Sequence, residues 1–214
     1  MEKSEIIEKV AKEIEITFKS DSSGHDWWHM YRVWKLAKRI AQKEKADLFV
    51  VELSALLHDV SDAKLNPGSN SLKEVEKILA PFGLEQSFIE RIAFIVENVS
   101  FSNTLAGKVL TDKEGLIVRD ADRLESSGAI GIARTFAYGG KIGRILYDPE
   151  QKPKFNDSIH YVSKDGTSIN HFYEKLLLLK DQMYTKTAKE IAQKRHKFLE
   201  AYLKEFLDEW EGKA

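Results

Sequence analysis

The sequence ELSALLHDVSDAK, residues 52–64, joins an apolar helical run directly to an imidazole and a carboxylate. The run LSALL is typical of a buried helix, yet His58 and Asp59 follow it at once. Asp62 and Lys64 come close behind. Burying an imidazole and a carboxylate without partners costs several kcal/mol. These side chains are therefore expected to be paired, exposed or bound to a ligand.

The composition is ordinary for a soluble globular protein. The chain has 214 residues, of which 43% are apolar and 31% are charged. No apolar run approaches the roughly 20 residues of a membrane span, and the stretch MEKSEIIEKVAKEIEITFKS lacks the apolar centre of a signal peptide. The absence of cysteine excludes disulfides, thiolate metal sites and cysteine nucleophiles. We therefore expect a cytoplasmic protein with no membrane partner.

Charge is balanced along the chain, with a formal net charge of −1. A nucleic-acid binder usually shows a basic patch or stripe. The nearest candidate, KEIAQKRHKFLEAYLKEF at 189–206, places acids soon after its bases, which is typical of a solvated helix face. We therefore expect no nucleic-acid partner.

Helical periodicity dominates the sequence. Apolar residues recur at helical spacing from about residue 6 to residue 18, and the loop signal NPGSN stands at 66–70. Further helices are expected at about 25–44, 48–58, 71–80, 85–98, 113–125 and 128–140, with a long helix or helix pair at about 168–210. Residues 141–166 show little periodicity, which predicts a long loop that could cover a site. We predict an all-α fold with a single domain over 1–214.

Histidines and acids are grouped near the ends of these expected helices. Of the six histidines, two fall in GHDWWHMYRV, where His25 and His29 are four residues apart and would share one helix face. His58 closes the next helix, and an acidic cluster, IVRDADRLESSGAIG, follows at 117–131. His160 and His196 are expected to be structural or exposed.

These groups could together bind a divalent metal ion. A catalytic metal needs a few imidazole and carboxylate ligands and one open position. His29 could supply a nitrogen, and His58 and Asp59 a nitrogen and an oxygen. Asp120 or Asp122 could add another oxygen. Nitrogen and oxygen ligands without sulfur suit manganese, iron, cobalt, nickel or zinc better than calcium, and magnesium stays open.

The order H…HD…D resembles the HD-domain superfamily of metal-dependent phosphohydrolases. The resemblance extends over four blocks: HDWWHMYRVWKLAKRIA, LSALLHDVSDAKL, DADRLESSGAIGIARTF and SINHFYEKLLLLKDQMYTKTA. These blocks look like those of the small, single-domain bacterial branch and span most of the chain. The HD pair alone is a weak signal, whereas four ordered blocks are a strong one. The resemblance implies a metal-site core at about 20–140, with C-terminal helices at about 168–210 packing on it.

The metal ligands that the resemblance implies are His29, His58, Asp59 and Asp122. His29 is preferred to His25 because the family's first histidine stands three residues before an Arg-Val pair. Asp122 is preferred to Asp120 because the family aspartate directly precedes a basic residue and a leucine. No histidine lies between His58 and Asp122, which argues for one tightly held metal. A second ion bridged by substrate phosphate is the alternative.

Other polar residues are expected around the metal rather than on it. The groups expected to orient the ligands are His25, Asp26, Asp120 and His171. His171 could instead pack between helices. The candidate catalytic groups are Asp59 and Asp62, although Asp62 could instead cap the loop. Glu52 is expected to face solvent.

Phosphoryl transfer demands mainly positioning and charge neutralisation, so cations are expected near the metal. The candidates for binding substrate phosphate are Lys64, Arg123, Arg134 and Lys175. Lys64 and Arg123 are preferred because they stand close to the ligands in sequence, and a surface salt bridge is the alternative for each of the four. The aromatic residues that could stack a nucleobase are Trp27, Trp28, Phe136 and Tyr138, although core packing is the commoner role.

The resemblance implies hydrolysis of a phosphoester or phosphoanhydride, and this branch is associated with converting nucleoside triphosphates to the monophosphate and pyrophosphate. We therefore expect a small phosphate ester, by preference a nucleotide, as substrate. No P-loop, G-x-G-x-x-G element or nucleophile elbow is present. The alternatives are a phosphomonoesterase or phosphodiesterase acting on another substrate, a non-catalytic metal or nucleotide sensor, and a purely structural protein. The segment 186–210 could complete the core or form a homodimer face.

Overall fold

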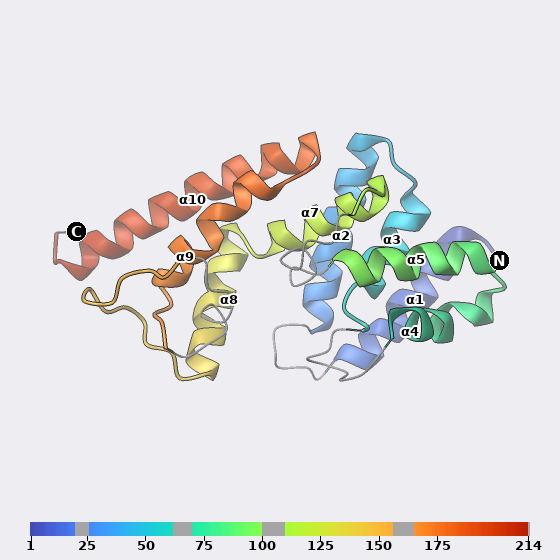
Figure 1. Cartoon of the computed structure of the whole chain (residues 1–214), viewed down its shortest axis with the longest axis horizontal. Helices are drawn as coiled ribbons and strands as arrows, with labels where there is room; N and C mark the ends of the chain where they lie inside the picture. Colours follow the sequence, from blue (N-terminus) through green and yellow to red (C-terminus); the bar gives the residue numbers. More distant parts are fainter. Residues whose placement is uncertain (20–25, 62–69, 100–109, 156–164, 214) are drawn as a thin grey trace. The chain divides into compact units, whose positions relative to one another are not determined.

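A computed structural model of the chain describes residues 1–19, 26–61, 70–99, 110–155 and 165–213 (Figure 1). Within these ranges every regular element is a helix, and one isolated bridge joins Ile145 to Thr167. The all-α prediction is therefore confirmed. No helix in the described part of the chain is long and apolar enough to cross a bilayer.

Contacts divide the chain into two compact units, Met1–Asp122 and Arg123–Ala214. The helices of the first unit are α1 (Lys3–Phe18), α2 (Trp27–Glu44), α3 (Leu48–Leu57), α4 (Ser71–Leu79), the 3-10 turn η1 (Ala80–Phe82), α5 (Gln86–Val99) and most of α7 (Lys113–Glu125). Those of the second are α8 (Gly128–Lys141), α9 (Asn170–Glu174), the 3-10 helix η3 (Leu176–Gln182) and α10 (Lys186–Trp210). That the whole chain forms one domain stays a prediction.

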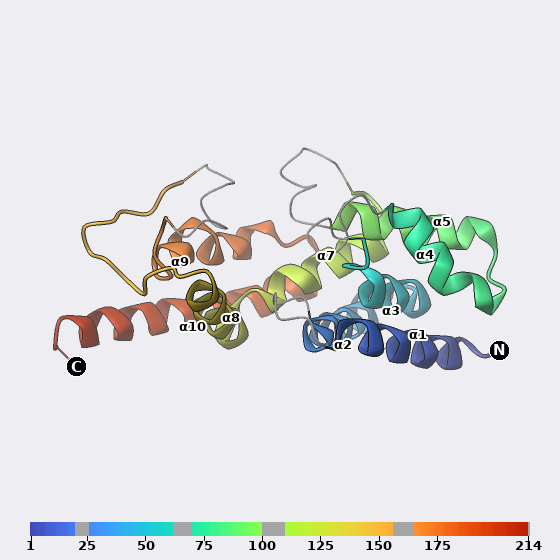
Figure 2. The same cartoon turned by 90° about the horizontal axis from the view of Figure 1, so that it is seen from below.

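Helix α3 is the core of the first unit. Every residue from Phe49 to Leu57 is buried, and the helix contacts α1, α2 and α5. In Figure 2, α1 and α2 lie on one side of α3, and α4 and α5 lie on the other. The helix begins where the side chain of Asp47 accepts hydrogen bonds from the backbone N–H groups of Phe49 and Val50. A helix enclosed in this way holds the residues at its end in a fixed place.

Glu52 lies inside this core rather than in solvent, and the prediction for it was wrong. It is 3% exposed. Its Oε2 accepts hydrogen bonds from Trp34 Nε1 at 2.8 Å and from Lys38 Nζ at 3.0 Å. These partners on α2 satisfy the buried carboxylate, so Glu52 ties α3 to α2.

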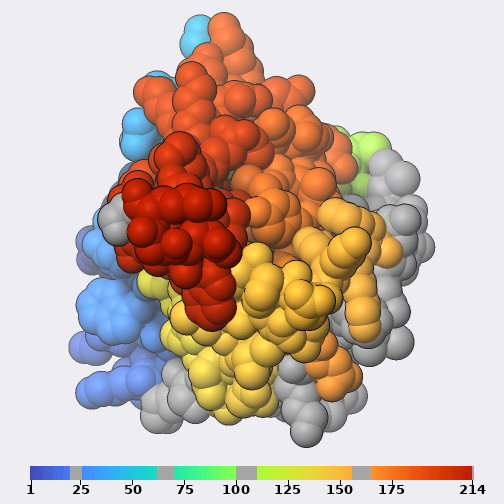
Figure 3. Space-filling view, turned by 90° about the vertical axis from the view of Figure 1, so that its left-hand side faces the viewer, coloured from blue at the N-terminus to red at the C-terminus, as the bar shows by residue number. Residues whose placement is uncertain are grey.

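In the second unit, α10 packs against η3 and α8. Aromatic side chains fill part of this unit: Phe172 of α9 stacks on Tyr202 at 5.7 Å between ring centroids, and Tyr147 lies edge-on to Trp210 at 5.0 Å. Figure 3 shows the end of α10, in dark red, against the segment that follows α8, in yellow. The aromatic contacts therefore anchor the C-terminal half of α10 to this segment.

The segment predicted as a long helix or helix pair is divided in the structure. Lys175, with φ −139°, ends α9, and the side chain of Thr185 accepts a hydrogen bond from Ala188 N at the start of α10. Of the predicted loop at 141–166, the described residues 142–155 form no regular helix. Residues 156–164, with His160, lie outside the described residues.

Candidate metal centre

The first turn of α2 positions His29. Asp26 is the N-cap of the helix, and its Oδ1 accepts a hydrogen bond from the backbone N–H of His29 at 2.9 Å. The His29 side chain lies on the buried face of the helix together with Met30 and Val33, and His29 is 1% exposed. Asp26 therefore fixes the backbone that carries this imidazole, as a residue beside a ligand would.

The end of α3 supplies two further groups. His58 is the C-cap of α3, and Asp59 follows in the next turn. His58 Nδ1 lies 2.8 Å from the carbonyl oxygen of Ala55. A carbonyl oxygen can only accept a hydrogen bond, so Nδ1 carries the proton and the neutral ring presents the lone pair of Nε2. This is the tautomer that a metal ligand needs.

Helix α7 turns the Asp122 side chain toward the two histidines and the Asp120 side chain away from them. Asp122 Oδ1 lies 3.6 Å from His29 Nε2 and 4.0 Å from His58 Nε2. Asp120 is fully buried, and a separation of two residues places the two side chains about 200° apart around a helix. The structure therefore brings Asp122, rather than Asp120, to the two histidines.

The donor atoms of the other three residues form a tighter group. The Nε2 atoms of His29 and His58 are 3.1 Å apart, and Asp59 Oδ2 lies 3.4 Å from each of them. All three residues are buried. Asp122 is the most open member, with 24% of its side chain exposed against 11% for Asp59 and 2% for each histidine.

These spacings fit the coordination sphere of one metal ion. Ligand atoms bonded at about 2.1 Å lie about 3.0 Å apart at right angles and about 3.4 Å apart at the tetrahedral angle. The three buried residues fall within or close to this range. The longer separations to Asp122 fall below the value of about 4.2 Å for ligands on opposite sides of the ion. Two imidazole nitrogens and two carboxylate oxygens are a donor set for a divalent transition metal.

Three of the predicted site residues, His25, Asp62 and Lys64, lie outside the described residues. The other predicted phosphate-binding cations belong to the second unit. Arg123 is buried, donates from Nη1 to the Gln182 carbonyl at 2.8 Å, and lies over the ring of Tyr184 at 5.8 Å. Arg134 forms an ion pair with Glu125. Both arginines therefore already make contacts within their own unit.

Lys175 and His171 stand one turn apart at α9, where the backbone N–H of Lys175 donates to the His171 carbonyl at 3.0 Å. Burial, followed by the charges of Lys175 and Arg144, lowers the pKa of His171 to about 3. The imidazole is therefore neutral at neutral pH. His171 is itself only partly buried, but it lies in α9 beside the fully buried Phe172, which suits the helix-packing alternative of the sequence prediction.

The four aromatic residues proposed for base stacking differ in their surroundings. Phe136 packs against Phe172 at 6.0 Å and Tyr202 at 6.1 Å, which is core packing. Trp28 is 58% exposed and Tyr138 is 37% exposed, and the rings of Trp27 and Trp28 each lie 5.8 Å from the ring of Tyr31 between centroids. The structure brings none of the four together with another in a ring contact among the described residues.

Sequence reasoning missed one group that shapes the site, the backbone carbonyl of Ala55. It orients the His58 ring and favours the tautomer with the proton on Nδ1. A carbonyl has no side-chain signature, so only its position three residues before His58, one helical turn away, could have indicated the contact.

Comparisons with known proteins give the family of this chain. A family model described as HD domain matches residues 27–127, which include the four donors. The Bacillus subtilis protein YpgQ is 39% identical over 202 residues, covering 92% of this chain and 90% of the relative. The chain belongs to the HD-domain family. It is therefore a metal-dependent hydrolase of the phosphohydrolase class, and its fold implies a divalent metal.

Solved structures of similar proteins extend the match over nearly the whole chain. An HD-superfamily hydrolase from Bacillus thuringiensis is 40% identical with a TM-score of 0.78, covering 98% of this chain and 99% of that one. Bacillus subtilis YpgQ in complex with ADP superposes with a TM-score of 0.77 at 34% identity, covering 98% of this chain and 96% of that one. The HD prediction from the sequence is confirmed.

Proposed function

We propose that this HD-family enzyme hydrolyses nucleoside triphosphates to the monophosphate and pyrophosphate at one divalent transition metal. The ligands would be His29, His58, Asp59 and Asp122. The convergence of their four donor atoms carries the proposal. The structure of YpgQ with ADP supports a nucleotide as the substrate, because that relative is similar over almost its full length.

A bound divalent metal would supply Lewis-acid activation of water and of a phosphoryl oxygen. The residues of the chain supply the rest. Ala55 holds the His58 ring in the tautomer that leaves Nε2 free, and Asp26 holds the turn that carries His29. The greater exposure of Asp122 marks the open side, from which substrate would approach. Because the donor atoms are already held in place, they would need little reorganisation during the reaction.

The acid–base and phosphate-binding roles remain predictions from the sequence. Asp59 would take part in both metal binding and proton transfer, with Asp62 as the second proton-transfer group. Lys64, Arg123, Arg134 and Lys175 are the predicted phosphate contacts. For Arg134 to bind phosphate, its ion pair with Glu125 would have to break. Arg134 is therefore the least favoured of the four phosphate-binding candidates.

The test is turnover by metal-free protein reloaded in turn with Mn²⁺, Fe²⁺, Co²⁺, Ni²⁺, Zn²⁺ or Mg²⁺. Nucleoside and deoxynucleoside triphosphates, monophosphates, cyclic nucleotides and sugar phosphates would be offered, with phosphate and pyrophosphate detected separately. We expect pyrophosphate from triphosphates. The Asp59→Ala variant should lose at least about 100-fold in turnover, the upper range for the loss of a group that merely orients a ligand.

A matched control is His196→Gln, which changes a buried histidine of the second unit that bonds Lys180 and Glu200. It should keep its metal and its turnover. Orthophosphate released from monophosphates would replace the proposal with a phosphomonoesterase. An Asp59→Ala protein that stayed fully active with metal bound would contradict the ligand assignment.

A further inference from the structure

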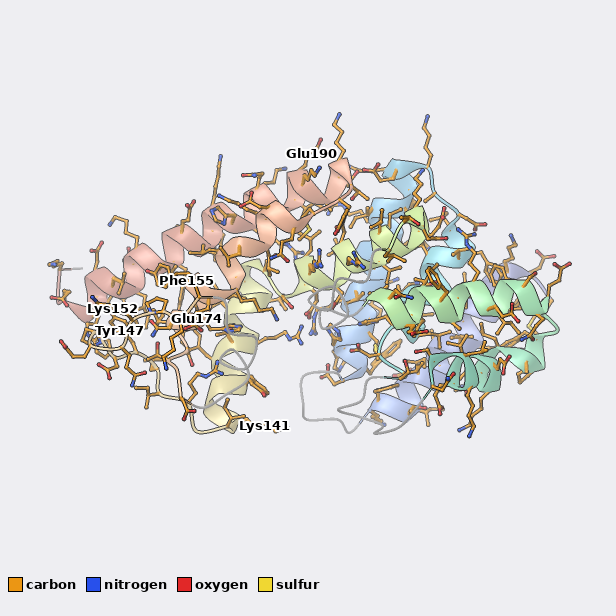
Figure 4. All side chains as sticks on the ribbon, in the orientation of Figure 1. Lys141, Tyr147, Lys152, Phe155, Glu174 and Glu190 are labelled. Atoms are coloured by element: carbon orange, nitrogen blue, oxygen red, sulfur yellow. The ribbon has the colours of Figure 1, made fainter. Side chains whose placement is uncertain are left out.

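Helix α3 carries a single charged residue, Glu52, in the middle of its buried run. Charged side chains of this chain generally lie at the surface, as the labelled Lys141 and Glu190 do in Figure 4, whereas Glu52 is 3% exposed. Removing a carboxylate from water is unfavourable, and a buried ion pair is often no more stabilising than apolar side chains of the same volume. Stability alone therefore gives no reason for a carboxylate at this position of the core.

Glu52 and the two histidines of the donor cluster contact α2 at different heights of the same helix pair. Glu52 Oε2 accepts hydrogen bonds from Trp34 Nε1 at 2.8 Å and from Lys38 Nζ at 3.0 Å. The Nε2 atoms of His29 and His58 are 3.1 Å apart. The partner of the earlier residue on α2 is the later one along α3 and its C-cap, so the two helices run antiparallel.

The two contacts are separated by similar distances on the two helices. His29 stands five residues before Trp34 on α2, and His58 stands six residues after Glu52. At the rise of an α-helix these separations are about 7.5 Å and about 9 Å. A shift of α3 along α2 would therefore displace the carboxylate contact and the histidine contact together.

No other residue of α3 could replace Glu52 if the helix shifted by one turn. The residues one turn before or after it are apolar: Leu48, Phe49, Ala55 and Leu56. A shift of about 5.4 Å would leave the carboxylate buried without Trp34 and Lys38, which is strongly unfavourable. Contacts among apolar side chains are not directional, so they do not select one register in this way. The carboxylate therefore disfavours every register but the observed one.

We propose that Glu52 and Trp34 are positioning residues for the metal centre. Their buried hydrogen bond fixes the register of α3 against α2, and so holds the two histidine nitrogens at the spacing of two ligands of one ion. A misplacement of about 1 Å, caused by a change far from the reacting atoms, can cost about 100-fold in rate. The inference rests on the proposed ligand set, but not on the substrate or on the bond that is cleaved.

The test measures metal binding apart from turnover. The metal-free full-length chain is titrated with Co²⁺, whose dissociation constant comes from calorimetry and whose visible absorption reports the coordination geometry. In Trp34→Phe/Glu52→Leu, apolar side chains replace the hydrogen bond, and Lys38, whose side chain is 39% exposed, can turn to solvent. We expect the Co²⁺ dissociation constant to rise at least about tenfold, the lower range for losing a group that orients a ligand, and the spectrum to change. Urea denaturation of the metal-free variant should show a stability close to that of the parent chain.

Single changes keep the test decisive if the double variant does not fold. Trp34→Phe removes the donor but keeps an aromatic ring, and it should weaken Co²⁺ binding. Glu52→Gln keeps an oxygen that can accept from Trp34, and it should bind Co²⁺ nearly as the parent chain does. The matched control is Phe88→Leu, which changes a residue of α5 whose ring stacks on Phe49 of α3 at 5.2 Å. It loosens α3 away from α2 and should leave the Co²⁺ affinity unchanged.

Three results would overturn the proposal. The first is a Trp34→Phe variant with the Co²⁺ affinity and spectrum of the parent chain, which would leave the ligand set intact and make the hydrogen bond a purely structural contact. The second is a loss of affinity in Phe88→Leu as large as that in Trp34→Phe, because any loosening of α3 would then have the same effect. The third is a parent chain that binds no Co²⁺, which would overturn the proposed ligand set as well.

Discussion

Two clusters of polar side chains differ in what holds them together. In the first unit, His29, His58 and Asp59 turn their donor atoms toward one point, with separations of 3.1 to 3.4 Å. In the second unit, Arg123 donates to a backbone carbonyl, and Arg134 pairs with Glu125. The first arrangement suits a bound cation, whereas the second is a set of contacts within the fold. Convergence of donor atoms, rather than residue type, separates a candidate ligand from a structural side chain.

The largest expected effect comes from removing the most exposed member of the donor cluster. Asp122→Asn takes away one carboxylate charge, and we expect metal affinity and turnover to fall by at least about 100-fold. Asp120→Asn is the comparison on the same helix, because the buried Asp120 is predicted to orient a ligand rather than to bind the metal, so it should lose less of both. Metal content by elemental analysis and turnover are the readouts. Loss of metal in Asp120→Asn alone would reverse the assignment.

The second-largest expected effect is a loss of stability on removing a cation of the second unit, Arg134. Arg134→Met leaves Glu125, whose side chain is 2% exposed, without this partner. Breaking a buried ion pair costs about 3–5 kcal/mol. Because 27% of the Arg134 side chain is exposed, we expect a loss of about 2 kcal/mol in the free energy of unfolding. Urea denaturation followed by circular dichroism measures it.

The double variant Glu125→Gln/Arg134→Met is the control for that measurement. Removing the buried charge together with its partner should recover part of the lost stability, because no carboxylate is then left buried without Arg134. If Arg134→Met were as stable as the parent chain but needed more substrate for half-maximal turnover, Arg134 would bind phosphate after all. The distinction between the donor cluster of the first unit and the structural contacts of the second would then not hold for Arg134.

Local signals in the sequence were enough to place most helices of the first unit. The predicted segment 113–125 matches α7, and the cap residues Asp47 and Asn70 stand directly before α3 and α4. Short side chains that bond the first turn make such starts visible in sequence. The HD pair was found in the same way, because His58 and Asp59 break an otherwise apolar run.

Interactions between distant residues could not be seen in the sequence. Glu52 looked exposed because its partners, Trp34 and Lys38, stand 18 and 14 residues away. The ion pair of Arg134 with Glu125 joins the end of one helix to the next, and no periodic pattern indicates it. Choosing Asp122 over Asp120 depended on a family resemblance, and the structure supplies the physical reason, since the two side chains point to different sides of α7.

The smallest expected effect concerns the neutral histidine of the second unit. Its unfolded-state pKa is about 6.5, and in the folded protein burial, with Lys175 and Arg144 nearby, lowers the pKa of His171 to about 3. The unfolded chain therefore binds more protons than the folded chain between these two pKa values. The contribution of His171 to stability is complete above the unfolded-state pKa and is lost as the pH falls below it. The slope from this one group is at most about 1.4 kcal/mol per pH unit.

Urea denaturation of metal-free protein at pH 7, 6 and 5 measures this slope and separates His171 from the donor cluster. His171→Gln should lose less stability than the parent chain over that range, because its amide takes up no proton. His196→Gln, which alters a buried histidine of the same unit, supplies the comparison. Parallel curves for His171→Gln and the parent would show that His171 stays accessible to protons when folded. It would then regain its predicted place among the groups that orient the metal ligands.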